Sequence, residues 1–358
     1  METLLEVRNL SVGIRKEKQM LSAVEDISFD IYSGEILGIV GESGSGKSLT
    51  ALSIPSLLGG GAEVSGGSIV FYEENKGVPG GAGRDGSSPG GARRARDLLK
   101  LPEKELQNIR GNEISMIFQE PFSSLNPLMK VGAQIAETLV LHENRVLHEN
   151  REFRGEKGKT LINGRVMELM EKLGLPESAK LAEAYPHRLS GGMCQRVMIA
   201  LAIICRPRLL IADESTTALD QNTQSQILKL MKEINRDLGT SILFISHDLE
   251  VIKNICGRVL VMYAGRILEE GDTEEIFFHP AHEYTRGLLG SIPGRANRGR
   301  DLANIPGKVP SLDEGRPAGC PFHPRCGKAV PACRGDFPGL RAVSASHKTR
   351  CILAEEGK

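Results

Sequence analysis

The sequence predicts an α/β fold, in which a parallel β-sheet carries a phosphate-binding loop, from three observations. Glu35–Val40 is a short apolar run suited to a buried strand, and it leads directly into the glycine-rich segment Gly41–Ser48. A second apolar run, Leu209–Ala212, is followed by two adjacent carboxylates, and a third, Ser241–Ser246, is followed by a histidine. Ligands of α/β proteins bind at the carboxyl edge of the sheet, so the polar residues at these strand ends are candidate site residues.

The first motif, Gly41–Ser48, reads GESGSGKS and fits the phosphate-loop pattern G-x-x-x-x-G-K-[ST] at every fixed position. Its glycines let the backbone N–H groups face phosphate oxygens, and the helix that follows adds a partial positive charge. Lys47 is expected to reach the β- and γ-phosphates, and the Ser48 hydroxyl to ligate Mg²⁺. The alternative, a glycine-rich turn that carries a lysine by chance, is disfavoured by both flanks. The predicted nucleotide-binding residues of this segment are Gly41, Glu42, Ser43, Gly44, Ser45, Gly46, Lys47, Ser48 and Leu49.

The two carboxylates after the second run are Asp213 and Glu214. Asp213 is expected to hold Mg²⁺, and Glu214 to act as the general base that polarises the attacking water. His247 can hydrogen-bond the γ-phosphate and orient that base. Gln119 ends another apolar run and is expected to touch the metal and the water. We therefore predict Glu214, His247 and Gln119 as catalytic residues, and Ser48, Gln119 and Asp213 as magnesium ligands. Two solvated acids at a strand end are the alternative.

A second loop, Leu189–Arg196, reads LSGGMCQR. Ser190, Gly191 and Gly192 precede a stretch that favours a helix, so their N–H groups and the hydroxyl form another anion site. One chain needs only one loop to cradle a triphosphate, which indicates that the second loop caps a nucleotide held by a partner. An ordinary helix capped by serine is the alternative.

These motifs together resemble the nucleotide-binding subunit of an ABC transporter. Its Walker A, signature and Walker B motifs are GESGSGKS, LSGGMCQR and LLIADE, its Q-loop and H-loop residues are Gln119 and His247, and its D-loop ends at Asp220. The stretches IFQEPFSSLNPLMK and FFHPAHEYTRGLLGSIP, with the tail segments GCPFHPRC and HKTRC, further resemble the ATPase subunits of oligopeptide/dipeptide importers. The resemblance adds the signature residues Ser190, Gly191 and Gly192, and Asp220, to the nucleotide-binding residues.

What the resemblance implies is an ATPase, dependent on ATP and Mg²⁺, that powers peptide import. It implies a second, paralogous ATPase subunit, two transmembrane permeases and an extracytoplasmic solute-binding protein as partners. It also implies a peripheral position on the cytoplasmic face of the membrane. Two alternatives remain open: an importer of nickel or another small solute in the same family, and a soluble ABC ATPase without a permease.

The resemblance also predicts the domain organisation. An ABC-type ATPase domain, with a RecA-like core, an antiparallel β-subdomain and a helical subdomain at about 120–196, is expected over 1–270. A small cysteine-rich C-terminal extension is expected over 271–358. Residues 77–96 are rich in glycine, proline and serine and then basic, which predicts a flexible surface insertion. Residues 140–151 repeat the hexapeptide VLHENR, which we interpret as a duplication that extends a helix or loop.

Three positions depart from the family pattern. Ile14 stands where the family has an adenine-stacking aromatic residue, so nucleotide is expected to bind somewhat more weakly. Ser215 replaces the usual proline after the catalytic glutamate, and Cys194 replaces the usual arginine of the signature. Both of these changes leave the predicted chemical groups in place.

Composition limits the class of partner. The formal net charge is zero and the pI is about 7.1, so the sequence predicts no nucleic-acid surface. No apolar stretch approaches the roughly 18 residues that a membrane-spanning helix needs. Any association with a membrane is therefore expected to run through partner subunits.

Four of the seven cysteines cluster near the end of the chain, spaced C-x5-C-x6-C-x17-C. Cytosolic disulfides are disfavoured, so such a cluster favours a metal site. The spacing fits neither the tight pairs of common zinc sites nor the usual ferredoxin runs, which leaves zinc, an iron–sulfur cluster and free thiols open. The resemblance implies a [4Fe–4S] cluster with a structural role. Its ligands would be Cys320, Cys326, Cys333 and Cys351.

Overall fold

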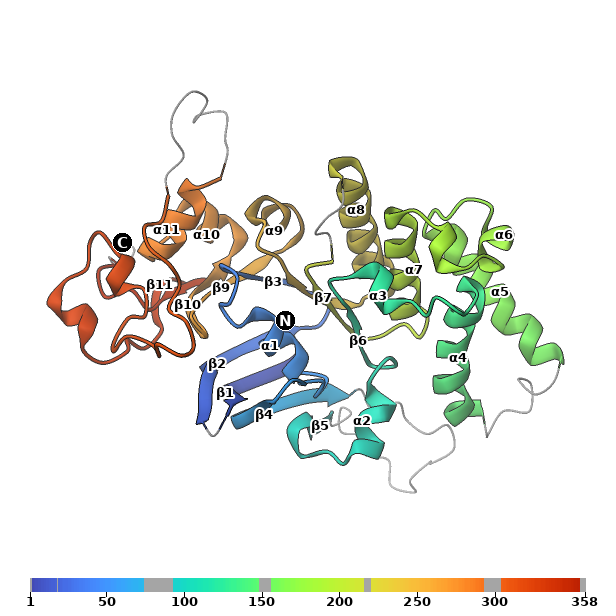
Figure 1. Ribbon diagram of the computed structural model, residues 1–358, viewed down its shortest axis with the longest axis horizontal. Coiled ribbons are helices and arrows are strands. Elements are labelled where there is room, and N and C mark those ends of the chain that lie inside the picture. Colours follow the sequence, from blue (N-terminus) through green and yellow to red (C-terminus); the bar gives the residue numbers. More distant parts are fainter. Residues whose placement is uncertain are drawn as a thin grey trace, which may run out of the picture.

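The computed structural model describes residues 2–17, 19–73, 93–147, 156–215, 220–292 and 304–354 (Figure 1). Within these ranges the strands form one four-stranded and one eight-stranded sheet. The strands are β1 (Thr3–Lys16), β2 (Gln19–Tyr32), β3 (Ile36–Val40), β4 (Ala62–Glu73), β5 (Arg94–Asp97), β6 (Ile114–Ile117), β7 (Leu209–Asp213), β8 (Ser241–Ile245), β9 (Arg258–Tyr263), β10 (Arg266–Asp272), β11 (Arg341–Ser344) and β12 (His347–Thr349). The helices are α1 (Lys47–Ser53), α2 (Glu103–Ile109), α3 (Pro121–Ser124), α4 (Val131–Leu147), α5 (Glu156–Lys172), α6 (Ser178–Ala182), α7 (Gly191–Ile203), α8 (Gln221–Leu238), α9 (Leu249–Ile255), α10 (Thr273–Phe278) and α11 (Glu283–Gly290).

The eight-stranded sheet has the order β11-β12-β10-β9-β3-β8-β7-β6. Its centre is parallel, because β3 pairs in parallel with both β8 and β9, and β7 pairs in parallel with β6 and β8. Every residue of β3, β7 and β8 is buried, which is typical of parallel strands covered on both faces. The three strands predicted from apolar runs are therefore confirmed.

Side chains of the central strands alternate between two hydrophobic cores, as the two-residue period of a strand requires. Leu37 and Ile39 of β3 join the core shared with the antiparallel sheet β2-β1-β4-β5. Ile36 and Val40 join the core shared with helices α7, α8 and α9. Figure 1 accordingly shows the antiparallel sheet on one side of the central strands and α8 and α9 on the other.

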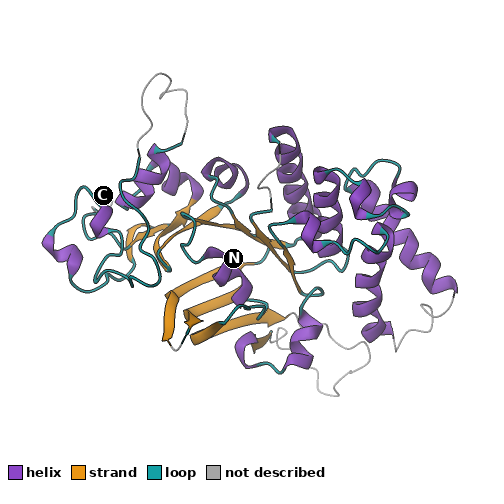
Figure 2. Cartoon of the chain, in the orientation of Figure 1, coloured by secondary structure: helices purple, strands orange, loops and turns teal. Residues whose placement is uncertain are grey.

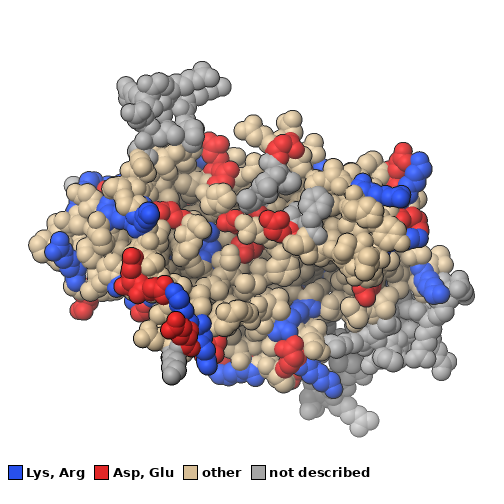
Figure 3. Space-filling model, in the orientation of Figure 1, with Lys and Arg blue, Asp and Glu red and all other residues tan. Residues whose placement is uncertain are grey.

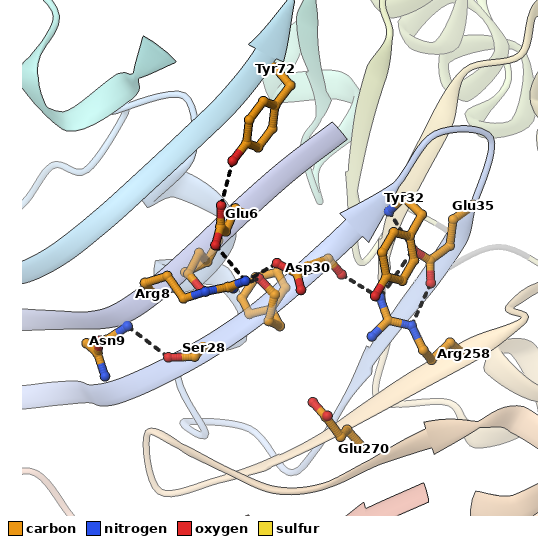
Figure 4. A network of polar contacts seen from close by, with 12 residues as sticks. Glu6, Arg8, Asn9, Ser28, Asp30, Tyr32, Glu35, Tyr72, Arg258 and Glu270 are labelled. Atoms are coloured by element: carbon orange, nitrogen blue, oxygen red, sulfur yellow. Dashed lines mark hydrogen bonds and ion pairs between the residues drawn. The ribbon is translucent and has the colours of Figure 1, made fainter. Parts of the chain in front are cut away.

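A polar network ties the two sheets together (Figure 4). Arg258 of β9 pairs with Glu35 at 2.8 Å and also donates to the backbone carbonyl of Asp30 in β2. On the neighbouring strand β1, Arg8 pairs with both Asp30 and Glu6 at 2.7 Å. The side chains of Arg258 and Glu35 are 19% and 9% exposed, so this pair is more sheltered from solvent than an ordinary surface ion pair.

The helical region is longer than predicted. Helices occupy most of the described chain from Pro121 to Ile203, and Figure 2 shows them as a separate, all-helical part of the molecule. The predicted end at residue 196 falls inside α7. The helix continues because the sequence VMIALAI contains no helix breaker and its side chains, from Val197 to Ile203, are mostly buried.

The predicted flexible insertion at 77–96 is wrong for its last residues. Arg94, Ala95 and Arg96 lie in β5, which pairs antiparallel with β4. The basic composition indicated a solvated segment, but the Arg96 guanidinium pairs with Glu73 at 2.6 Å and with Glu105. Residues 77–92 of the insertion lie outside the described residues.

The hexapeptide repeat at 140–151 begins inside a helix. Helix α4 continues to Leu147, through the first copy and into the second. Residues 148–151 lie outside the described residues.

The C-terminal segment belongs to the same sheet as the nucleotide-binding strands. The predicted boundary at 270 falls within β10, and β12 pairs antiparallel with β10. Behind this pairing, the fully buried carboxylate of Glu269 accepts hydrogen bonds from the backbone N–H groups of Ala281 and His282 and from the Thr285 hydroxyl. Nε2 of His347, on β12, lies 2.7 Å from the same carboxylate. This buried polar cluster fixes the end of the chain to the sheet.

On the face drawn in Figure 3, acidic and basic side chains are interspersed, with no large surface of one sign among the described residues. Over the same described ranges, no helix combines the length and the apolar character that crossing a membrane requires.

Candidate functional site

The candidate site lies where four neighbouring parallel strands end. In the order β3-β8-β7-β6, these ends carry the phosphate loop, His247, the Asp213–Glu214 pair and Gln119. Parallel pairing places all four ends at one edge of the sheet. The edge thus gathers residues that lie far apart in the sequence.

The phosphate loop connects β3 to α1 and requires glycine at its start. A Cβ atom on Gly41 would lie 2.1 Å from the carbonyl oxygen of Met262, so no other residue fits without moving the backbone. Gly46, which precedes α1, has a φ of 97°, in the region that favours glycine. The Lys47 ammonium lies inside this loop and donates to the carbonyl oxygens of Gly41 and Glu42 at 2.8 and 2.9 Å.

Ser48 and Asp213 form the second element of the site. The Ser48 hydroxyl donates to the Asp213 carboxylate at 3.2 Å, which places the two predicted magnesium ligands side by side. Burial raises the pKa of Asp213 above its ordinary value. Burial lowers the pKa of Lys47, while the charges of Glu214, Asp213 and Glu42 act in the opposite direction. Hydroxyl and carboxylate oxygens are ligands of the type that Mg²⁺ prefers.

Glu214 is the meeting point of the predicted catalytic residues. The Gln119 amide donates to one oxygen of its carboxylate at 2.9 Å, and Nδ1 of His247 lies 3.3 Å from the other. Glu214 also adopts a left-handed backbone conformation with a φ of 47°. For a residue other than glycine this costs on the order of 1–3 kcal/mol and is found most often at functional sites. Beside it, Ser215 is buried, and its hydroxyl has no hydrogen-bond partner in the described part of the chain.

The signature residues are placed on a different element. Ser190 caps α7, accepting from the N–H of Met193 at 3.4 Å, which confirms the helix predicted after LSGG. Cys194, which stands where the family has arginine, is buried in the hydrophobic core. The cysteine therefore does not disturb the Ser190 cap. Within the described residues, Ser190–Gly192 make no hydrogen bond to the phosphate loop. Asp220 also belongs to a different element from the phosphate loop. Its carboxylate caps α8 by accepting from the N–H groups of residues 222 and 223.

Two further contacts to the phosphate loop could not be predicted from any sequence pattern. The backbone N–H of Glu42 donates to the Tyr284 hydroxyl at 2.9 Å, and the Glu42 carboxylate pairs with Arg325 at 3.0 Å. Tyr284 lies in the stretch HEYTRG, which resembles the family but carries no motif for phosphate binding. Arg325 lies between two of the clustered cysteines, where a single arginine carries no recognisable pattern.

The four clustered cysteines surround one small cavity. Cys320, Cys326, Cys333 and Cys351 all line it, together with His282 and Phe322. All seven cysteines of the chain are free thiols. Burial raises the pKa of the Cys320 thiol to about 11. No group of three or more histidine, cysteine, aspartate or glutamate side chains in the described ranges is arranged to hold a metal ion.

Comparison with known protein families gives two matches. Residues 24–217 match the family described as ABC transporter, and residues 268–333 match the C-terminal region of oligopeptide/dipeptide transporters. Among curated proteins, the chain is 43% identical to the oligopeptide transport ATP-binding protein AppD of Bacillus subtilis, over 99% of this chain and 98% of AppD. It is 42% identical to OppD of Salmonella typhimurium, over 99% and 94%, and 41% identical to the dipeptide transport protein DppD of Bacillus subtilis, over 99% and 96%.

Solved structures share the fold. The dimeric ATP-binding cassette MJ0796, in a post-hydrolysis state with ADP and phosphate, superposes with a TM-score of 0.59 at 25% identity, over 75% of this chain and 99% of that one. CbiO1 from Clostridium perfringens, part of the transporter complex cbiONQ, superposes with a TM-score of 0.57 at 26% identity, over 78% and 92%.

Proposed function

Because this chain belongs to the ABC transporter family, as an ATPase subunit of an oligopeptide/dipeptide importer, we propose that ATP is bound and hydrolysed at the edge formed by β3, β8, β7 and β6. The observation that carries this proposal is the convergence on Glu214. Gln119 and His247 contact its two carboxylate oxygens, while Ser48 contacts the adjacent Asp213.

In this arrangement each residue has a separate task. The N–H groups of the loop from Gly41 to Leu49 and the Lys47 ammonium bind the phosphates. The oxygens of Ser48, Asp213 and Gln119 fit a magnesium ion by their chemical type, and Mg²⁺, when bound, neutralises charge on the phosphates. Glu214 accepts a proton from the attacking water. His247 and Gln119 orient the Glu214 carboxylate through their contacts with its two oxygens.

Substitution of Glu214 by glutamine tests the assignment of the base. Glu214→Gln keeps the shape and removes the charge that accepts the proton, so ATP binding is retained and turnover falls by at least about a hundredfold. The measurements are equilibrium binding of a fluorescent ATP analogue and release of phosphate. Glu274→Gln, at an exposed position on α10, is the control and should match the parent chain. Turnover close to the parent rate in Glu214→Gln would refute the assignment.

We further propose that the signature loop serves the nucleotide of a second ATPase subunit. Ser190 and Gly191–Gly192 lie at the start of α7, and none of them hydrogen-bonds to a described residue of the chain's own phosphate loop. A reciprocal dimer would bring this loop, and Asp220 beside it at the start of α8, to the partner's triphosphate. The proposed partner is a paralogue, since related importers pair two ATPase subunits. The test is a mixed pair in which only this chain carries Ser190→Arg. A fall in ATP turnover at the partner's site would support contact between this signature loop and the partner's nucleotide, whereas unchanged turnover at that site would oppose it.

The permeases are proposed to contact the surface that follows Gln119. Phe118 is 43% exposed and Leu128 is 85% exposed, so apolar side chains face solvent on both sides of α3. Movement of Gln119 on nucleotide binding would be transmitted to that surface. We propose that the chain lies peripherally on the cytoplasmic face of the membrane and that an extracytoplasmic binding protein delivers the solute. Affinity purification from gently solubilised membranes tests this: two permeases and a second ATPase should co-purify, and ribosomal proteins in their place would favour a soluble ATPase.

Peptides are the cargo class, in keeping with the family, and the individual peptide is set by subunits other than this one. Transport assays with the reconstituted complex distinguish peptides from nickel and other small solutes. Uptake of nickel but no peptide would select the alternative.

The cysteine cavity is proposed to hold a [4Fe–4S] cluster. Four cysteines that line one cavity supply the ligand set of such a cluster. A cluster bound to the four cysteines would crosslink, and so stabilise, a segment rich in glycine and proline. Iron, sulfide and zinc analysis after anaerobic purification tests the proposal: about four irons per chain are expected, whereas stoichiometric zinc or no metal would overturn it.

A further inference from the structure

We propose that Arg325, from the cysteine-rich C-terminal segment, is a positioning residue for the phosphate loop. Its guanidinium holds Glu42, the second residue of that loop, and through Glu42 it fixes the backbone on which Lys47 depends. This inference rests on the proposed ATP binding at the loop. It extends the nucleotide site into a part of the chain that supplies none of the predicted nucleotide-binding residues.

Arg325 is anchored before it reaches Glu42. It lies at the end of a short 3-10 helix, His323–Arg325, and its side chain is only 8% exposed. Its Nε donates to the carbonyl oxygen of Pro306 at 2.8 Å, and its Nη2 to that of Ile305 at 3.4 Å. Two of its three nitrogens are thus held by backbone, and the third, Nη1, is directed at Glu42.

At Glu42, Nη1 of Arg325 lies 3.0 Å from both carboxylate oxygens and 3.3 Å from the Tyr263 hydroxyl. The backbone of Glu42 is held as well, because its N–H donates to the Tyr284 hydroxyl and its carbonyl accepts from Lys47. All three polar groups of this residue therefore have partners, and two of those partners belong to the C-terminal segment. A loop fixed in this way is pre-organised for its ligand.

Because Glu42 is negatively charged, its pairing with Arg325 affects the binding of ATP. Its carboxylate lies close enough to act electrostatically on Lys47. Without Arg325 the carboxylate would be left unpaired, at 27% exposure, beside a site that receives phosphates. It would repel the phosphates and compete with them for the Lys47 ammonium. Arg325 therefore both neutralises the charge and fixes its position.

The position of Arg325 depends on the packing around the cysteines. Arg325 directly precedes Cys326, and Phe322 of the same turn packs against the rings of Tyr263 and Tyr284 at 5.5 and 5.3 Å. The turn that carries Arg325 thus borders the cysteine cavity, which is lined by Phe322, His323 and Cys326 but not by Arg325 itself. The C-terminal segment acts as part of the ATP site and is more than an appendage to it.

Substitution of Arg325 in the full-length chain tests the proposal. Arg325→Ala should raise the Kd for ATP by about tenfold or more, as expected for loss of a charge-assisted hydrogen bond. The kcat at saturating ATP should change by less than about twofold, because Arg325 contacts no reacting atom. Arg325→Lys keeps the charge, but its single nitrogen cannot both pair with Glu42 and replace the two anchors to the backbone, so its Kd should lie between those of Arg325→Ala and the parent chain.

A double-mutant cycle with Glu42→Ala separates positioning from general damage. If Arg325 acts through Glu42, Arg325→Ala should add little to the Kd in the Glu42→Ala background. Lys328→Ala removes a side chain that is 61% exposed and pairs with Glu283 in the same segment, so it should leave the Kd unchanged. Thermal unfolding of each variant shows whether the fold is retained.

Three outcomes are decisive. A Kd for Arg325→Ala within about twofold of the parent value would overturn the inference. So would an equal increase with and without the Glu42 carboxylate, because Arg325 would then act by another route. If the parent chain itself bound no ATP, the proposed function would fail, and that result is distinguishable from the other two.

Discussion

Replacement of His347 by alanine should detach the end of the chain from the sheet. His347 and Glu269 are both fully buried, and Nε2 of His347 lies 2.7 Å from the Glu269 carboxylate. In His347→Ala the carboxylate keeps the donors from residues 281, 282 and 285 but loses its contact with β12. The change therefore leaves an incompletely satisfied carboxylate in the interior, together with a cavity.

The cost follows from the burial. A hydrogen bond to a charged group contributes about 1.5–3 kcal/mol, and a cavity the size of an imidazole adds to this, so we expect a loss of about 3 kcal/mol in the free energy of unfolding. The next residue, Lys348, provides a matched comparison on the same strand. It pairs with Glu270 at 2.8 Å, but its side chain is 53% exposed, so Lys348→Ala should cost no more than about 1 kcal/mol.

The chain contains no tryptophan, so far-ultraviolet circular dichroism in urea is a suitable assay. Urea midpoints are compared for the parent chain, His347→Ala and Lys348→Ala, with the slopes of the transitions as a check that the same unit unfolds. If His347→Ala and Lys348→Ala were equally stable within about 0.5 kcal/mol, burial would not determine the strength of this contact, and the reasoning would be wrong.

Two further predictions concern the nucleotide site. Burial raises the pKa of Asp213, so its ionised form costs stability at neutral pH, and this cost disappears as the pH falls through the raised pKa. Asp213→Asn should therefore raise the melting temperature of the nucleotide-free chain at pH 7 while magnesium-dependent turnover is lost; a lower melting temperature would contradict this sign. Lys47→Ala should weaken binding of a fluorescent ATP analogue and remove about 3 kcal/mol of transition-state stabilisation, whereas Lys229→Ala, 80% exposed on α8, should do neither.

The chemical groups of the site could be predicted from the sequence because most of them fall within short motifs. The GESGSGKS segment contains its glycines, Lys47 and Ser48 within one turn, and the apolar run before Asp213 identifies a buried strand. The strand order that brings Gln119 and His247 to Glu214 cannot be predicted from any single segment of the sequence. It follows from the parallel pairing of β6, β7, β8 and β3, which the motifs indicated only through their resemblance to a family.

The contacts that sequence patterns could not predict are single polar residues paired over long separations. Arg325 and Glu42 are 283 positions apart, and His347 and Glu269 are 78 apart. No periodicity or spacing identifies such pairs, because each depends on the folded position of two strands or loops. The prediction of a solvated segment at Arg96 was wrong for a related reason. Its basic composition indicated exposure to solvent, whereas the Arg96 guanidinium pairs with the carboxylates of Glu73 and Glu105.

The pairing of Arg325 with Glu42 has a consequence for synthesis of the protein. The phosphate loop leaves the ribosome early, since a chain is made from its N-terminus at about 5–20 residues per second. Its partner Arg325 follows only after 283 further positions. A nascent or prematurely terminated chain thus displays a complete GESGSGKS motif while lacking the residue that holds its second position. On the proposed role of Arg325, full affinity for ATP would be acquired only after Arg325 has been synthesised and the C-terminal segment has packed against the phosphate loop.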